Sequence, residues 1–395
     1  MSLPSEKEKK LCLNLLFLAC GRWLRGVSGA GLRNDFSFPP GLNWDVLGKM
    51  AYYHNLEALV YLLVKKKWFP GELIPEQLLR EWEGAYYSNL ILNSEIISLL
   101  ARLLGECRHN DIPVIVLKGP AALALVYKDT GLRAMADLDI LCRKEDLKAL
   151  SDIAFSLGCR RQGFIRLHHV IFAHETLGIY LELHFNLYHF MKNKKRFLKS
   201  VWEKKERVRL EETEFPVMSL EAQLAFEVAH FLEHRASVSL KHYLDFAGKL
   251  FLLKDELDRK ELERLLDLAG LREEFVSFSA ALPQLLDLPP EAFLFQVEPL
   301  PGNLDILKKK KLELSASIGF ANSEEAGAEL KRQAGLIKKI IFVFKRLFPP
   351  LAAIQAAYNL PTLSKAFFWI PRHLREVLRD FRERKDTERA AIDRE

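Results

Sequence analysis

The chain has 395 residues, of which 49% are hydrophobic and 28% charged, a composition that excludes wholesale disorder and collagen-like repeats. Its net charge of +6, from 58 basic and 52 acidic residues, is compatible with a phosphate-bearing ligand but too small for a dedicated DNA-binding protein. The five cysteines include no C-x-x-C pair, which favours a reducing, cytoplasmic compartment over a disulfide framework.

Residues 1–109 are predicted to form an N-terminal helical region. Apolar residues recur at three- and four-residue spacing from Trp44 to about His109, which is the period of a helix with one buried face. The apolar run before Cys20 looks superficially like a lipoprotein signal, but the acidic Glu8 that precedes it disfavours this interpretation.

Residues 110–205 are predicted to form a core of strands and helices. Short β-branched or apolar runs between turn residues predict strands, and a helical period between them predicts helices. In chain order these elements are a strand over 113–117, a helix over 121–127, a strand over 137–142, a helix over 145–157, and strands over 169–173 and 179–185. The order predicts an α+β fold, with a small mixed sheet flanked by N-terminal and C-terminal helical parts.

Residues 206–395 are predicted to form a C-terminal helical region. Helical periodicity begins after Ser219, a residue type that caps helices. The apolar stretch from Ile340 to Ala356 is broken by two charges and two prolines, whereas a membrane span needs about 20 mostly apolar residues. We therefore expect no membrane span.

The predicted strand over 137–142 carries two aspartates. Side chains two residues apart in a strand point to the same side, so Asp137 and Asp139 present two carboxylates on one face. Adjacent carboxylates repel each other unless a cation relieves them, and hard oxygen ligands suit Mg²⁺ or Mn²⁺. The alternative is a solvated strand end with two surface acids.

A third carboxylate lies on a later strand. Glu182 shares one face of the strand over 179–185 with Tyr180 and His184. Three carboxylates on neighbouring strands can hold two metal ions that activate an attacking oxygen and neutralise a leaving phosphate. The alternative is an outward-facing acid on a half-exposed strand.

Two cations are candidates for phosphate binding. Lys118 and Gly119 join a strand to a helix, where backbone N–H groups and a cation receive phosphate. Arg133 precedes Asp137 by four residues and is able to clamp phosphate oxygens bidentately. Each cation taken alone is equally an ordinary surface residue.

The histidines show no convincing metal-binding spacing. His230 and His234 are four residues apart on a predicted helix, the spacing of two ligands on one face, but no third ligand is evident. A position in the core or at the rim of a site is the simpler interpretation for both. His168, His169 and His174 show no ligand spacing.

Taken together, the motifs resemble a known family. The resemblance is to the uncharacterised bacterial nucleotidyltransferase family of the DNA polymerase β-like superfamily. It is carried by Leu117-Lys118-Gly119, Tyr127, Arg133, Asp137-Leu138-Asp139-Ile140-Leu141 and Glu182-Leu183-His184, and more loosely by His230, Lys241 and Asp245.

The resemblance implies an enzyme that moves a nucleoside monophosphate from an NTP to an acceptor and releases pyrophosphate. It implies Asp137 and Asp139 as ligands of Mg²⁺ or Mn²⁺, with Glu182 as the third carboxylate. It further implies that Lys241 lies near the triphosphate. The acceptor would be a small molecule or a protein.

Two alternatives to this enzyme remain open at this point. Pro120 after Gly119 offers no N–H to a phosphate, which favours a catalytically degenerate fold that acts as a binding or regulatory module. An RNA-end nucleotidyltransferase would need a basic surface, and the densest basic patch runs from Lys192 to Lys199. A solvated face is favoured for this patch over nucleic-acid contact, because the overall charge is weak.

Overall fold

The computed structural model describes residues 4–29, 37–163, 165, 168–234 and 238–288, together with 353–355, 360, 365, 369–372 and 375. Most of the stretch from Ile340 to Ala356 lies outside these residues. The chain divides into two compact units, and each unit is assembled from separate stretches of sequence.

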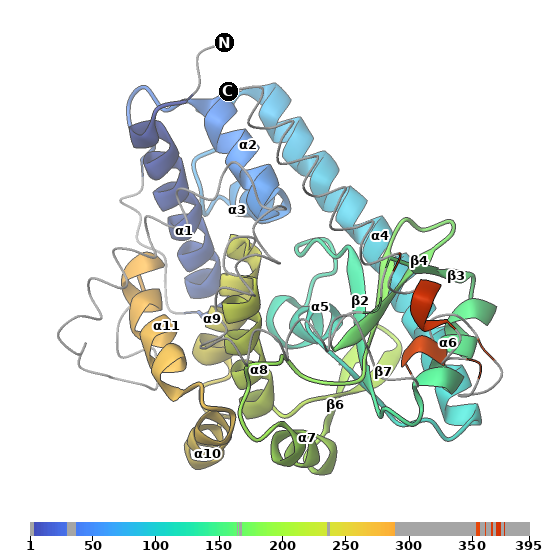
Figure 1. The fold of residues 1–395 in the computed structure, drawn as a ribbon. Coiled ribbons are helices and arrows are strands. Elements are labelled where there is room, and N and C mark those ends of the chain that lie inside the picture. Colours follow the sequence, from blue (N-terminus) through green and yellow to red (C-terminus); the bar gives the residue numbers. More distant parts are fainter. Residues whose placement is uncertain are drawn as a thin grey trace. The chain divides into compact units, whose positions relative to one another are not determined.

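The first unit comprises described residues within 95–121, 136–218 and 320–395 and is built on a seven-stranded mixed sheet (Figure 1). The strands are β1 (Val114–Val116), β2 (Asp137–Cys142), β3 (Cys159–Gln162), β4 (His169–His174), β5 (Tyr180–His184), β6 (Glu206–Leu210) and β7 (Thr213–Val217). Their spatial order is β3-β4-β5-β2-β1-β7-β6, with β2 parallel to β5 and β1 parallel to β7. This sheet, with helices α6 (Leu147–Ser156) and α7 (Lys194–Glu203), confirms the predicted mixed-sheet fold.

Three strands of this sheet were not predicted. The β6–β7 hairpin lies in the stretch that was assigned to the C-terminal helical region, so the sheet unit extends to Met218. The hairpin alternates charged residues with apolar ones such as Val208 and Phe215, which is the period of a strand with one covered face. Its high charge concealed this signal. The four-residue β3 is too short to carry a clear pattern of its own.

The second unit is helical and comprises described residues within 4–94, 122–135 and 219–288. Its elements are α1 (Glu6–Ser28), α2 (Trp44–His54), α3 (Glu57–Lys65), the π-helical turn η1 (Leu123–Tyr127), α8 (Leu220–Glu233), α9 (Leu240–Leu252), α10 (Arg259–Ala269) and α11 (Arg272–Leu285). Helices α4 (Glu76–His109) and α5 (Gly119–Ala122) pass from one unit to the other. Helix α1 packs against both α9 and α11, so N-terminal and C-terminal helices belong to one unit. This division therefore differs from the predicted boundaries at residues 109 and 205.

Helix α1 combines well-formed ends with a buried face. The Ser5 hydroxyl accepts a hydrogen bond from the Glu8 N–H and the Glu8 carboxylate accepts one from the Ser5 N–H, which caps the helix. Within the described residues, Lys7–Ser28 is the one helical stretch long and apolar enough to cross a membrane by length and composition. In its most apolar window 61% is buried inside the protein, and Trp23 is completely covered.

The N-terminus of α9 is held by a histidine from α2. Ser239 precedes the helix but makes no side-chain capping bond, and the Leu240 N–H instead donates to Nδ1 of His54 at 3.3 Å. His54 is fully buried, and burial lowers its pKa to about 4. The histidine must therefore be neutral to fold into this position.

We expect the protein to lose stability on mild acidification because of His54. The unfolded chain binds a proton near pH 6.5, whereas the folded chain does so only near pH 4, so stability is complete above pH 6.5 and falls below it. The free energy of unfolding should drop by about 2 kcal/mol more between pH 7 and pH 5 than in His54→Gln, which retains an acceptor. Urea denaturation at the two pH values measures this difference. An equal change in the free energy of unfolding between pH 7 and pH 5 for both proteins would refute the assignment.

Candidate active site

One face of the sheet, formed by β2 and β5, gathers carboxylates. The register places Asp139 directly opposite Glu182 and Asp137 opposite Tyr180. Since side chains alternate along both strands, these four point to the same face. Asp139 is 1% exposed and Asp137 is half-buried, whereas Tyr180 is 48% exposed. The face is therefore accessible to solvent at the end marked by Asp137 and Tyr180.

Asp139 is the most tightly bound of the three acids. Nζ of Lys118 donates to its Oδ1 at 3.1 Å, and Nε2 of His184 lies 2.7 Å from the same oxygen. Burial alone would raise the pKa of Asp139, but Lys118 and His184 outweigh this effect and hold the pKa below its usual value. The carboxylate is thus ionised and ready to serve as a metal ligand.

Lys118 is positioned by the turn that follows β1. Its backbone has φ of 48°, in the left-handed region that non-glycine residues seldom occupy. Burial alone would lower the pKa of Lys118, but the charge of Asp139 and its neighbouring carboxylates raises it well above the ordinary value. A strained backbone therefore delivers a permanent positive charge to the carboxylates.

Glu182 lies beside two histidines. Its Oε2 is 3.4 Å from Nε2 of His184 and 3.8 Å from Nε2 of His169. Burial opposes the charged form of His184, yet its contacts with Asp139 and Glu182 raise its pKa above the ordinary value. Oxygen or nitrogen atoms of Asp139, Glu182 and His184 all lie within 4.8 Å of one another, a spacing that a metal ion can bridge after small adjustments.

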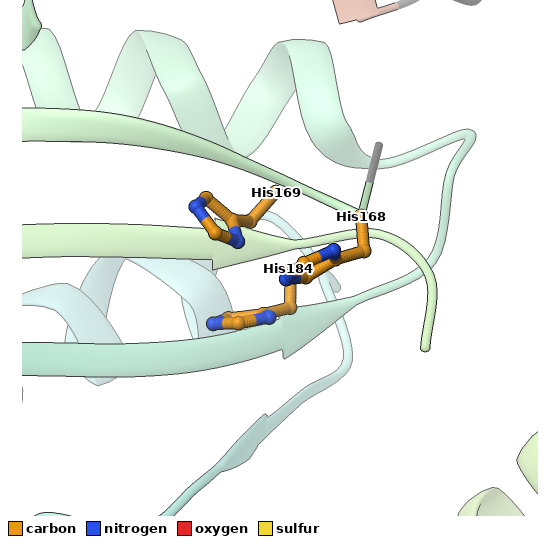
Figure 2. Close-up of side chains that lie close together, drawn as sticks. All are labelled: His168, His169 and His184. Atoms are coloured by element: carbon orange, nitrogen blue, oxygen red, sulfur yellow. The ribbon is translucent and has the colours of Figure 1, made fainter. Parts of the chain in front are cut away.

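Three histidines meet where β4 begins and β5 ends, and sequence spacing did not reveal this cluster. The antiparallel register of β4 and β5 sets His169 opposite His184, and His168 stands just before β4 (Figure 2). The usable signal was the pairing of these two strands and not the spacing along one of them. Sequence reasoning had left His168 and His169 without a ligand role.

Arg133 and Lys241, both predicted near phosphate, make structural contacts in the helical unit. Arg133 is 3% exposed, and its Nε and Nη2 donate to the carboxylate of Asp245 at 2.7–3.0 Å. The Tyr127 hydroxyl donates to the same carboxylate at 2.9 Å. Nζ of Lys241 donates to the carbonyl oxygen of Ala134 at 3.0 Å. These bonds anchor the segment that leads into β2.

Gly119 begins the short helix α5 directly after Lys118 and is buried. The next residue, Pro120, lies inside this helix and has no N–H to donate. Of the residues at this turn, Lys118 has the contact with the carboxylates described above. Phosphate binding by the backbone of Gly119 stays a prediction.

The site thus combines hard anionic ligands with a half-buried cation, an arrangement that can bind a divalent metal ion and a phosphate-bearing ligand. A comparison with known protein families matches residues 40–286 to the uncharacterised nucleotidyltransferases. The match covers more than half of the chain, and the protein therefore belongs to this family. This confirms the resemblance found in the sequence.

Similar solved structures include three nucleotidyltransferases. The antibiotic-resistance factor ANT(2″)-Ia is 13% identical, with 48% of this chain and 97% of that chain covered and a TM-score of 0.36. The lincosamide adenylyltransferase LnuA, solved with lincomycin, is 17% identical, covering 38% and 94%, with a TM-score of 0.28. A putative nucleotidyltransferase from Thermotoga maritima is 16% identical, with the same coverage and TM-score. A comparison with curated proteins finds no match.

Proposed function

We propose that this protein is a cytoplasmic, Mg²⁺- or Mn²⁺-dependent nucleotidyltransferase that moves a nucleoside monophosphate from an NTP to a small-molecule or protein acceptor. Family membership supports the reaction class. The observation that carries the site assignment is the register that sets Asp139 opposite Glu182 on two parallel strands, with Asp137 on the same face.

The three carboxylates would hold the divalent cation. Their oxygens fit a hard ion such as Mg²⁺, and Asp139 is held ionised by its neighbours. When bound, the metal would supply positive charge to the phosphates and to the acceptor oxygen. Asp137, at the more open end of β2, would meet the incoming nucleotide first.

The reaction forms one bond and breaks another. The acceptor oxygen bonds to the α-phosphorus, and the bond from that phosphorus to the bridging oxygen breaks, so that pyrophosphate leaves with the electron pair. Glu182, whose side chain is 19% exposed, is placed to take the proton from the acceptor hydroxyl. Lys118 would bind a phosphate oxygen once Asp139 serves as a metal ligand.

A transfer assay tests the proposal. The purified chain is incubated with Mg²⁺, each of the four α-labelled NTPs in turn, and a cell extract separated into small-molecule and protein fractions. We expect label on one fraction and release of pyrophosphate. Binding of an NTP without transfer would instead establish the alternative, a nucleotide-binding module, and salt-sensitive transfer to RNA ends would move the acceptor to nucleic acid.

We expect Lys118→Gln to weaken NTP binding by about 10- to 100-fold, because a charge-assisted hydrogen bond contributes about 1.5–3 kcal/mol. Titration calorimetry with Mg²⁺ and a non-hydrolysable NTP measures the affinity. Lys148→Gln is the matched control, since Lys148 forms an exposed ion pair with Asp152 on α6. NTP affinity equal to that of the unmodified protein would show that Lys118 serves only to neutralise Asp139.

A further inference from the structure

A cluster of three imidazoles lies where β4 and β5 meet. The ring centroids of His168 and His169 are 4.4 Å apart, those of His169 and His184 4.9 Å, and those of His168 and His184 5.7 Å (Figure 2). One nitrogen from each ring lies within 4.8 Å of the other two. Tetrahedral coordination at about 2.0–2.1 Å needs nitrogens roughly 3.4 Å apart, so an ion would be accommodated by small ring movements.

The cluster is shielded from water. His168 is 8% exposed, His169 6% and His184 2%. Exclusion of water leaves the side chains of the cluster, and not solvent, as the ligands that an ion would meet there. Among the described residues, this is the one group of three histidines whose nitrogens approach this closely. His230, His234 and His242 in the helical unit have ring contacts but do not meet this spacing.

Two carboxylates, Asp139 and Glu182, lie beside the cluster. Nε2 of His184 lies 2.7 Å from Oδ1 of Asp139, so Nδ1 is the nitrogen that remains to bind an ion, and such a carboxylate–histidine pair orients metal-bound imidazoles in other proteins. Glu182 Oε2 lies 3.8 Å from Nε2 of His169, at the edge of the group. Three imidazoles suit Zn²⁺, Co²⁺ or Ni²⁺, whereas Mg²⁺ prefers oxygen ligands throughout.

We propose that His168, His169 and His184 form a transition-metal site that favours Zn²⁺, Co²⁺ or Ni²⁺ and adjoins the carboxylate site for Mg²⁺. The two sites share the Asp139–His184 contact, so an ion at the histidines fixes the orientation of the carboxylate that the first site uses. The inference rests on the histidine geometry and holds whether or not the chain transfers nucleotides.

The test begins with the full chain after removal of metals by a chelator. Titration with Co²⁺ should give one equivalent bound and the visible absorption of imidazole-coordinated cobalt, and Zn²⁺ should displace it. X-ray absorption of the Zn²⁺ form should show about three imidazole nitrogens around the ion. No binding, or a shell of oxygen atoms alone, would overturn the proposal without any variant.

Variants then locate the ion. His169→Gln and His168→Gln should each weaken Zn²⁺ binding by about 100-fold or more, by analogy with the 10- to 100-fold that loss of an orienting partner costs. His174→Gln, also on β4, and the double variant His230→Gln/His234→Gln should bind Zn²⁺ normally. Loss of binding in the latter pair would place the ion in the helical unit and refute the site. The metal-free melting temperature checks that each variant is folded.

A separate arm keeps this site apart from the proposed enzyme. Asp137→Asn should lose Mg²⁺-dependent NTP binding and retain Zn²⁺ binding, because Asp137 is not a ligand of the proposed histidine site. Zn²⁺ binding without NTP transfer would leave the inference standing and reject the enzyme. Nucleotidyl transfer without Zn²⁺ binding would support the enzyme and reject the histidine metal site.

Discussion

Replacing Asp137 and Asp139 together by asparagine should reduce nucleotidyl transfer by about a thousandfold or more and remove Mg²⁺-dependent NTP binding. The amide retains the shape of the side chain but not the negative charge that holds the metal. Metal stabilisation of the transferring phosphate is worth several kcal/mol, and each 1.4 kcal/mol is about tenfold in rate. Initial rates of pyrophosphate release and calorimetry with a non-hydrolysable NTP measure the two effects.

The control for this experiment is Asp152→Asn, which removes an exposed aspartate on α6 that pairs with Lys148. This variant should keep full transfer activity. Glu182→Gln should lower the rate of nucleotidyl transfer about as much as the double variant does. It should retain part of the NTP affinity of the unmodified protein, since we assign Glu182 to the acceptor side. Equal NTP affinity in the double variant and in the unmodified protein would reject the site assignment.

Arg133→Ala should destabilise the helical unit by about 3–5 kcal/mol, because it leaves the carboxylate of Asp245 buried without its cation. Both side chains are about 5% exposed or less, and the pair is bidentate. Urea denaturation gives the free energy of unfolding. This outcome would establish Arg133 as a structural residue in place of the phosphate ligand that its sequence position favoured.

The double variant Arg133→Met/Asp245→Leu completes the cycle. Replacing both charges by apolar residues should recover much of the stability lost in Arg133→Ala, because a buried ion pair contributes little net energy compared with apolar packing. Arg133→Lys should remain destabilised, since an ammonium cannot reproduce the bidentate contact. If the free energy of unfolding of Arg133→Ala lies within about 0.5 kcal/mol of that of the unmodified protein, and the variant loses NTP affinity instead, the phosphate-binding role is correct.

Local patterns in the sequence were sufficient for the strands that carry the carboxylates. The alternation of Asp137 and Asp139 with apolar residues predicted β2, and that of Glu182 with Leu181 and Leu183 predicted β5. The family and the mixed sheet followed from the same segments. The β6–β7 hairpin was missed because its charged residues concealed a period-two pattern that becomes clear only when β7 pairs with β1.

The partners of individual side chains required the tertiary structure. Arg133 and Asp245 are 112 residues apart in sequence, and no local pattern links them. His168 and His169 acquire meaning only from β4–β5 pairing, which sets His169 opposite His184. Lys118 reaches Asp139 because a left-handed turn redirects it toward the neighbouring strand. The sequence therefore identified which residues are charged but not which side chains they contact.

The sequence by itself determined the family, the mixed sheet and the two strands that carry the three carboxylates, because strand periodicity and residue type are local properties. Only the tertiary structure decided which charges meet, since strand order and register bring together residues that are far apart along the chain. It assigned Lys118 to Asp139 and Arg133 to Asp245, and it brought His168 and His169, which sequence spacing had left without a role, beside His184. The mild positive charge of the chain likewise acquires a local meaning where Lys118 lies among the carboxylates.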